Sequence, residues 1–321
     1  MTRELLILRH GKSDWDNNTD DFHRPLKDRG KRAAQHMGVW LQQQNLLPDC
    51  VVSSPAERAI VTAEKCCKAM GMGADAIQTE RLIYAASLNN LLKVVRGCPR
   101  QSRRLMLVGH NPGLEELLEF LADQEITLPE DGKLLPTATL ARLSLKQDWA
   151  ELDKGCARLE SIVRPAALPE KFPFPSPDGG ERRDRPAYYY TQSSVIPYRV
   201  GDDGLEILLI SSSKKKHWVV PKGIKDPGLS SQASAAKEAW EEAGVEGVVA
   251  EAAIGSYSYE KWGATCTVEV YPMEVTKVNP ESEWEERHRG REWVSPEKAV
   301  QRLKQEELKP LVQSLAARLG L

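Results

Sequence analysis

The most constraining feature of this chain is an acidic segment within Gly223 to Val245, GIKDPGLSSQASAAKEAWEEAGV. Glu238, Glu241 and Glu242 are spaced i, i+3 and i+4, which places three carboxylates on one face of an α-helix. Like charges at this spacing destabilise an isolated helix, whereas a divalent cation reverses the sign of the interaction. Mg²⁺ takes hard oxygen ligands and usually shares its shell with substrate phosphates. The spacing is compatible with a metal-binding helix, but taken alone it more often marks an exposed acidic helix face.

The remaining residues of this helix have the pattern of a packed surface. We expect the small residues Ala236, Ala239 and Ala243 to pack closely against a sheet. Gly244 is expected to end the helix in the left-handed conformation typical of a helix C-terminus.

This segment resembles the signature of Nudix hydrolases, G-x5-E-x7-R-E-U-x-E-E-x-G-U, where U is a bulky apolar residue. The matching positions are Gly223, Glu238, Glu241, Glu242, Gly244 and Val245, and the departures are Leu229, Lys237 and Ala239. The resemblance extends over residues 187–321 and implies an α-β-α sandwich with a mixed sheet. It also implies that Mg²⁺ or Mn²⁺, held by the three glutamates, assists hydrolysis of a phosphoanhydride. Glu241 and Glu242 count as catalytic, and the general base stays open between these glutamates and one from a nearby loop.

Basic residues around this segment are candidates for contacts with a polyanionic substrate. The PKG sequence and the later RGREWVSPEKAVQRL are similar to the branch that acts on diphosphoinositol and diadenosine polyphosphates. The implied substrate-binding residues are Lys214, Lys215, Lys216, Lys222, Gly223, Arg287, Arg289 and Arg291. For the lysine run and for Arg287 and Arg289, a solvated loop is the alternative.

Three expected strands in the first half of the chain each end at residues suited to binding phosphate. The apolar runs Leu5–Leu8, Cys50–Ser53 and Leu105–Gly109 lead into Arg9-His10, Ser54–Arg58 and His110. Ligand sites in open α/β sheets lie at the carboxyl ends of strands. Guanidinium groups match phosphate oxygens, and a neutral imidazole can attack phosphorus. The sequence therefore predicts a phosphoryl-transfer site, with two structural histidines as the alternative.

These residues lie in motifs that resemble the histidine phosphatase superfamily, over residues 1–166 and nearest to its SixA-like phosphohistidine phosphatase branch. The motifs are RHGKS, RPLKDRG, SSPAERAIVTA, LVGHNPG and LPTATLARL. The resemblance implies a phosphoglycerate-mutase-like α/β sandwich that needs no metal. It implies that His10 becomes phosphorylated in a pocket formed by Arg9, Arg58 and His110.

The general acid of larger members of that superfamily has no evident counterpart. Tyr84 occupies the best-aligned position, and Glu80 or Asp21 could fill the role. A poor leaving group needs a proton in the transition state, so a missing acid favours phosphoramidates or other activated phosphates.

The chain between the halves reads as a stiff linker. Residues 164–186 contain six prolines, and proline fixes φ and lacks an N–H. The expected organisation is a domain at 1–166, a linker at 167–186 and a domain at 187–321, with Phe172 and Phe174 as anchors to a domain.

Several local expectations follow from turn and strand chemistry. Ser54 and Pro55 are expected to cap a helix. Pro197 suggests an edge strand or a bulge. Val248–Tyr259 is expected to form one strand, and the last helix to span about Glu307–Leu319.

Composition limits the remaining possibilities. The net charge of −2 gives no general attraction to nucleic acid or membranes, and no apolar run approaches the length of a membrane span. Six scattered cysteines without a CxxC pair suggest reduced thiols and a cytoplasmic protein. The sequence thus predicts a cytoplasmic bifunctional phosphate hydrolase whose expected substrates are a small polyphosphate and a phosphohistidine protein or small activated phosphate. The alternative is a second domain that only senses a ligand and regulates the phosphatase.

Overall fold

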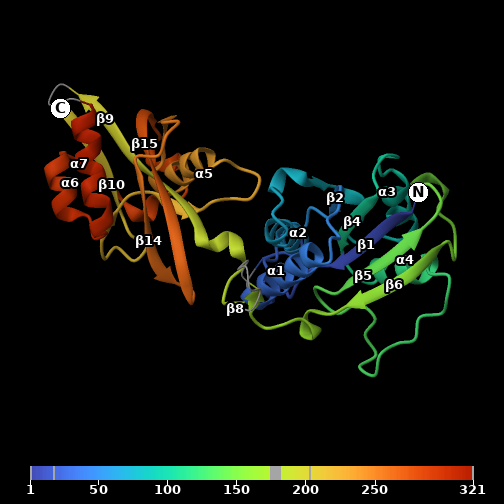
Figure 1. Ribbon diagram of the computed structural model, residues 1–321. Helices are drawn as coiled ribbons and strands as arrows, with labels where there is room; N and C mark the ends of the chain where they lie inside the picture. Colours follow the sequence, from blue (N-terminus) through green and yellow to red (C-terminus); the bar gives the residue numbers. More distant parts are fainter. Residues whose placement is uncertain (1, 17–18, 174–181, 202–203, 320–321) are drawn as a thin grey trace. The chain divides into compact units, whose positions relative to one another are not determined.

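A computed structural model describes the chain except for residues 1, 17–18, 174–181, 202–203 and 320–321. The chain forms two compact units, Met1–Phe172 and Pro173–Leu321 (Figure 1). Residues 174–181 of the expected linker, Phe174 among them, lie outside the described residues. The described linker residues include the turn η4 (Pro165–Ala167) and a pair of short strands, β7 (Phe172–Pro173) and β8 (Arg182–Arg183).

The first unit contains a six-stranded sheet with the order β3-β2-β4-β1-β5-β6. Its parallel strands are β1 (Arg3–Arg9), β2 (Cys50–Ser53), β3 (Ile77–Thr79) and β4 (Arg104–Gly109). Two further strands, β5 (Leu140–Leu145) and β6 (Ala157–Val163), run antiparallel at one side. Because β1, β2 and β4 are parallel neighbours, their carboxyl ends meet at one edge of the sheet.

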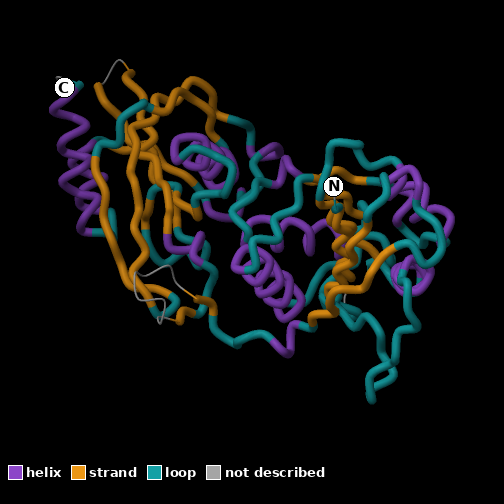
Figure 2. Tube along the Cα trace, turned by 45° about the vertical axis from the view of Figure 1, so that its right-hand side comes forward, coloured by secondary structure: helices purple, strands orange, loops and turns teal. Residues whose placement is uncertain are grey.

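Helices cover both faces of this sheet (Figures 1 and 2). Side chains alternate along β1, so Leu6 and Leu8 pack with one pair of helices while Leu5 and Ile7 pack with the other. The first pair is α1 (Asp28–Gln43) and α2 (Glu57–Ala69), and the second is α3 (Leu88–Arg96) and α4 (Gly113–Leu121). The expected cap of α2 is wrong: Ala56 holds the N-cap position, and Ser54 Oγ instead accepts a hydrogen bond from the amide of Ala56 at 3.3 Å.

Replacing Phe172 with alanine is expected to destabilise the first unit by about 3–5 kcal/mol. The Phe172 ring is fully buried and stacks on His36 with centroids 4.0 Å apart. Urea unfolding measures the effect, and Leu128→Ala is the control because Leu128 is 55% exposed. Equal stability of the two variants would contradict the prediction.

The second unit contains an eight-stranded mixed sheet. Its main path is β11-β10-β9-β15-β13, while β12 pairs with β9, β14 with β15 and β16 with β10. The strands are β9 (Thr191–Gly201), β10 (Gly204–Ser211), β11 (Trp218–Val219), β12 (Lys222–Ile224), β13 (Val245–Val249), β14 (Gly255–Lys261), β15 (Ala264–Val278) and β16 (Arg291–Val294). Strands β9 and β15 are parallel, and the other pairs are antiparallel.

Helices again pack on both faces, which confirms the predicted α-β-α class. One face carries α5 (Ser231–Glu238) and the π-helical turn η6 (Ala239–Ala243); the other carries α6 (Pro296–Arg302) and α7 (Lys309–Arg318). Ala239 and Ala243 are buried against the sheet as expected, but the third packing alanine is Ala235 and not Ala236. None of the helices among the described residues is both long enough and apolar enough to span a bilayer.

Two further expectations for this unit are wrong. Pro197 lies in β9, an interior strand, at the place where the partner on one side changes from β12 to β10. The expected strand Val248–Tyr259 is divided between β13 and β14. The expected last helix is confirmed: α7 ends at Arg318, and it follows directly on a short 3-10 turn, η9 (Glu306–Leu308).

Candidate active sites

Two histidine rings meet at the carboxyl ends of β1 and β4. The ring centroids of His10 and His110 are 5.1 Å apart. Nδ1 of His10 lies 2.7 Å from the carbonyl oxygen of Gly11, and it carries the proton because a carbonyl can only accept. Nε2 of the neutral ring therefore keeps its lone pair. This tautomer is the one that a nucleophilic imidazole needs.

Both rings are held neutral at ordinary pH. Burial lowers the pKa of His10 to about 4, with help from Arg58 and Arg9 and against the opposing effect of the Gly11 hydrogen bond. Burial and the neighbouring His10 lower the pKa of His110 to about 3. A bound anion would favour the protonated forms, so the pocket is electrostatically suited to a phosphate group.

Arginine side chains surround the two rings. Arg58 is buried and donates from Nη2 to a carboxylate oxygen of Asp21 at 2.8 Å. Nη2 of Arg24 lies 2.8 Å from the other carboxylate oxygen, so Asp21 neutralises both guanidinium groups. Several buried polar atoms have no hydrogen-bond partner among the described residues: Nε of Arg9, Arg24 and Arg58, and Nδ1 of His110. Unsatisfied buried polar atoms of this kind suit a polar ligand or ordered water.

The structure thus brings together all four residues predicted for this site. Arg9, His10, Arg58 and His110 line one pocket of about 440 Å³. Sequence reasoning missed Arg24 as a site residue, although it lies in the RPLKDRG motif, because no strand end marks its position.

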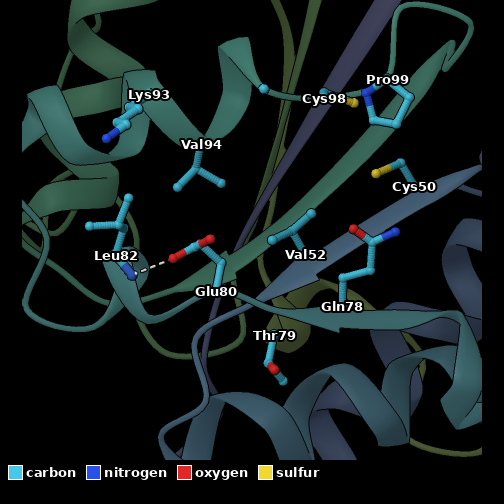
Figure 3. Close-up of a pocket in the computed structure, with 11 residues that line it drawn as sticks. Cys50, Val52, Gln78, Thr79, Glu80, Leu82, Lys93, Val94, Cys98 and Pro99 are labelled. Atoms are coloured by element: carbon cyan, nitrogen blue, oxygen red, sulfur yellow. Dashed lines mark hydrogen bonds between the residues drawn. The ribbon is translucent and has the colours of Figure 1, made fainter.

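The three candidates for the general acid are separated by the structure. Tyr84 borders the histidine pocket, with its ring centroid 5.7 Å from that of His110, and its hydroxyl donates to Asp21 at 2.8 Å. Glu80 lines a different pocket of about 240 Å³ beside Cys50 and Cys98, where its carboxylate accepts from the amide of Leu82 (Figure 3). Glu80 therefore does not line the histidine pocket, whereas Asp21 does.

The acidic segment departs from a regular α-helix at its functional end. Helix α5 ends at Glu238, and Glu241 and Glu242 lie in the π-helical turn η6, a feature frequent at functional sites. Gly244 ends the turn in the left-handed conformation, with φ 64°, as predicted. Burial, followed by Glu242 and Glu241, raises the pKa of Glu238 to about 8. Glu238 thus lies close enough to Glu241 and Glu242 for their charges to act on it despite the changed helix geometry.

Gly223 and Lys222 lie directly against these glutamates. A Cβ atom at Gly223 would overlap the carboxylate of Glu238, so a glycine is needed for this close approach. The amide of Lys222 donates to Glu242 at 3.0 Å, and its Nζ donates to the hydroxyl of Tyr259 at 2.8 Å. Burial, followed by the charge of Lys261, lowers the pKa of the Lys222 ammonium to about 8.

Lys237, a departure from the Nudix signature, has a partner that the signature does not contain. Its ammonium lies 2.7 Å from Asp226 and 3.6 Å from Glu241. Leu229, the other departure in this loop, is exposed. Asp226 therefore supplies the negative charge that is lost with leucine at position 229.

The other basic candidates have different surroundings. Arg289 is nearly buried and lies 2.5 Å from Glu242, with a second ion pair to Glu286. Arg291 donates to the carbonyl oxygens of Ala243, Gly244 and Asn279, which supports the end of η6. Lys214, Lys215, Lys216 and Arg287 are exposed, and no ion pair joins them to the three glutamates in the described part of the chain. Sequence reasoning did not name Glu286, whose amide donates to the carbonyl of Glu241 at 3.1 Å.

The Nudix resemblance implies a divalent metal ion, which needs several oxygen donors close together. Within the described ranges, no three His, Cys, Asp or Glu side chains form a group that could hold a metal ion. The donors still suit a hard cation, because the pKa of Glu238 is raised partly by Glu242 and Glu241. A cation between the carboxylates would relieve this repulsion.

Comparison with known proteins gives matches to both units. The family model of the histidine phosphatase superfamily (branch 1) matches residues 5–83, and the NUDIX domain model matches residues 191–315. An uncharacterized protein of Mycobacterium tuberculosis is 31% identical over 156 residues, or 47% of this chain and 96% of that protein. Nudix hydrolase 12, mitochondrial, of Arabidopsis thaliana is 32% identical over 142 residues, or 37% of this chain and 70% of that protein. The solved structure of the protein histidine phosphatase SixA complexed with tungstate matches with 19% identity and a TM-score of 0.44, over 51% of this chain and 97% of that one.

The folds and the two sites define an enzyme of the hydrolase class with two phosphate-directed units. The chain belongs to the Nudix family through its second unit. This confirms the Nudix resemblance, and the family model that matches residues 5–83 agrees with the resemblance of the first half to the histidine phosphatase superfamily.

Proposed function

We propose that the chain is a bifunctional phosphate hydrolase, with a phosphatase domain at 1–166 and a Nudix hydrolase domain at 187–321, joined by a linker at 167–186. The phosphatase domain works through a phosphohistidine on His10. The observation that carries this proposal is the Nδ1–H of His10 donating to Gly11, which leaves Nε2 as a nucleophile beside His110 and Arg58.

The residues of the first site divide the phosphatase reaction between them. Arg9, Arg58, Arg24 and His110 bind the phosphoryl oxygens. Nε2 of His10 forms a bond to phosphorus as the bond to the leaving group breaks. Water then attacks phosphorus, the N–P bond breaks, and inorganic phosphate is released.

The leaving group is expected to be an activated one. Burial alone would raise the pKa of Asp21, but the Tyr84 hydroxyl and Arg58 outweigh it and hold the pKa below its usual range. An ionised Asp21 cannot donate a proton at neutral pH. This favours phosphoramidates, such as a phosphohistidine protein, or small activated phosphates.

The Nudix domain is proposed to hydrolyse a phosphoanhydride in a nucleoside polyphosphate, a dinucleoside polyphosphate or a diphosphoinositol polyphosphate. Mg²⁺ or Mn²⁺, when bound by Glu238, Glu241 and Glu242, would polarise the phosphates and acidify water. Lys222 offers an ammonium beside this site, and Gly223 leaves room for Glu238. Lys214 and Lys216 would contact only the distal part of a long substrate. Arg289 would hold Glu242 in place, and Arg291 would support the turn.

A ligand sensor is the second candidate for the Nudix domain. It is favoured by the engagement of Glu242 with Arg289 and with the amide of Lys222, which occupies both carboxylate oxygens. A screen of phosphoanhydrides with Mg²⁺ and full-length protein separates the candidates, since only a hydrolase consumes its ligand. Release of phosphate from acetyl phosphate or phosphohistidine protein tests the first domain.

The six free thiols suit a cytoplasmic location.

We expect His10 to stay neutral well below the usual pH range of a histidine. Its imidazole should titrate near pH 4 instead of near 6.5, because burial and nearby guanidiniums oppose protonation. NMR titration of the ring signals measures this pKa. Adding inorganic phosphate should raise it, since a bound anion stabilises imidazolium. A midpoint near 6.5 without phosphate would contradict the site described here.

A further inference from the structure

A second pocket adjoins the one that contains His10. It has a volume of about 470 Å³ and shares Lys12 and Thr137 with the histidine pocket. The segment between the pockets is bonded to the catalytic strand, because the amide of Ala138 donates to the carbonyl of His10 and the amide of Arg9 donates to that of Thr139, both at 3.1 Å. The two pockets are therefore neighbours in the first unit, joined through Lys12 and Thr137.

The second pocket is lined by cations that have no counter-ion. The side chains of Lys12 and Arg29 form no hydrogen bond or ion pair with any described residue. The carboxylate of Asp131, the one acidic group among the described lining residues, is already paired with Arg164 at 2.8 Å. The neighbouring lysine, Lys27, pairs with Asp14 and Asp16, so these carboxylates are engaged elsewhere. The pocket thus keeps a net positive charge.

The pocket wall contains a further unsatisfied polar group. Thr139 is fully buried, and its hydroxyl has no hydrogen-bond partner among the described residues. The first turn of α1 also borders the pocket through Arg29, and the positive end of a helix dipole favours an anion. Gly30 allows this approach, since a Cβ atom there would overlap the carbonyl oxygen of Lys12. Buried polar groups without a partner usually indicate a bound polar group.

We propose that this pocket is a second anion subsite of the phosphatase, in which Lys12 and Arg29 bind a second phosphate or carboxylate of the molecule whose phosphoryl group is attacked by His10. This inference rests on the proposed function of the first domain and makes it more specific. The substrate class is a small molecule with two anionic groups, and a phosphohistidine side chain without a second anion would leave the subsite empty. Lys12 and Arg29 would be binding residues and would not contact the reacting phosphorus.

The test compares alkylphosphonates with α,ω-alkane bisphosphonates as competitive inhibitors of acetyl phosphate hydrolysis by the full-length protein, with chelator present. For the chain length that spans both pockets, we expect the bisphosphonate to bind about tenfold or more tightly than its matched monophosphonate, because its second phosphonate accepts charge-assisted hydrogen bonds from Lys12 and Arg29. Lys12→Ala and Arg29→Ala should each remove most of this preference, and Lys12→Arg should keep it. Lys146→Ala is the matched control, because Lys146 is an exposed lysine outside both pockets.

Equal inhibition by the two compounds at every chain length would overturn the inference, as would a preference that survives both alanine substitutions. If the monophosphonate itself fails to inhibit, the proposed phosphatase site is wrong, which is a different result. Calorimetric titration of the same compounds into His10→Ala, alone and combined with Arg29→Ala, measures the subsite without relying on turnover.

Discussion

Substitution of His10 by alanine will lower phosphate release from acetyl phosphate by on the order of 10⁴-fold or more, because it removes the imidazole nitrogen that attacks phosphorus. The ring is fixed by its Nδ1–H bond to Gly11 and faces His110 across the pocket. Asparagine at position 10 should be no more active than alanine, since an amide nitrogen has no available lone pair. Steady-state phosphate release by the full-length protein provides the measurement.

A matched control separates the nucleophile from a structural histidine. His36 is also a half-buried histidine of the first unit, and burial and Arg32 lower its pKa to about 4, but it stacks on Phe172 and lies in no histidine pocket. His36→Asn should therefore keep phosphatase turnover while reducing stability. Rapid quenching of the wild type should trap an acid-labile, alkali-stable phosphate on His10. A His10→Ala variant that keeps near-normal turnover would refute the assignment.

The second large effect is expected for Glu241→Gln. This change should lower phosphoanhydride hydrolysis by about 10²–10⁴-fold, because it removes a carboxylate from the expected metal and base set. Glu241 is half-buried, is close to Lys237, and receives a backbone hydrogen bond from Glu286. Rates measured over a range of Mg²⁺ concentrations show whether metal affinity, turnover or both are lost.

The control for this substitution is Glu251→Gln, since Glu251 is an exposed glutamate of the same unit that forms no ion pair in the described structure. The unfolding temperature of Glu241→Gln, measured with and without ligand, shows whether the variant still binds. A rise with ligand means that catalysis is lost while binding is kept. If the wild type consumes no anhydride while a polyphosphate ligand changes the phosphatase rate, the Nudix domain is a ligand sensor and not a hydrolase.

Much of the first site could be predicted from the sequence, because its residues follow strands that run parallel to one another. Parallel strands place their carboxyl ends at one edge, so apolar runs ending in Arg9-His10 and in His110 were expected to converge. Arg24 could not be found this way, because it lies on a loop whose path depends on contacts with Trp15 and Asp21.

The second site has features that local sequence patterns do not predict. The spacing of the glutamates identifies the donors, but it assumes regular α-helical geometry, and the structure has a π-helical turn at Ala239–Ala243. The environment of Arg289 was equally inaccessible from sequence, since its pairing with Glu242 joins residues that are 47 positions apart. Pro197 fits an interior strand only because two partner strands meet beside it, which no local pattern specifies.

If one chain contains two chemically independent phosphate hydrolases, a ³¹P NMR time course with the full-length protein will resolve the two reactions. Acetyl phosphate and a phosphoanhydride substrate are supplied together, with Mg²⁺ or with chelator, to the wild type, His10→Ala and Glu241→Gln. We expect His10→Ala to stop only the loss of acetyl phosphate, and Glu241→Gln or chelator to stop only the cleavage of the anhydride. Loss of both reactions in either variant, or loss of acetyl phosphate hydrolysis on metal removal, would contradict it.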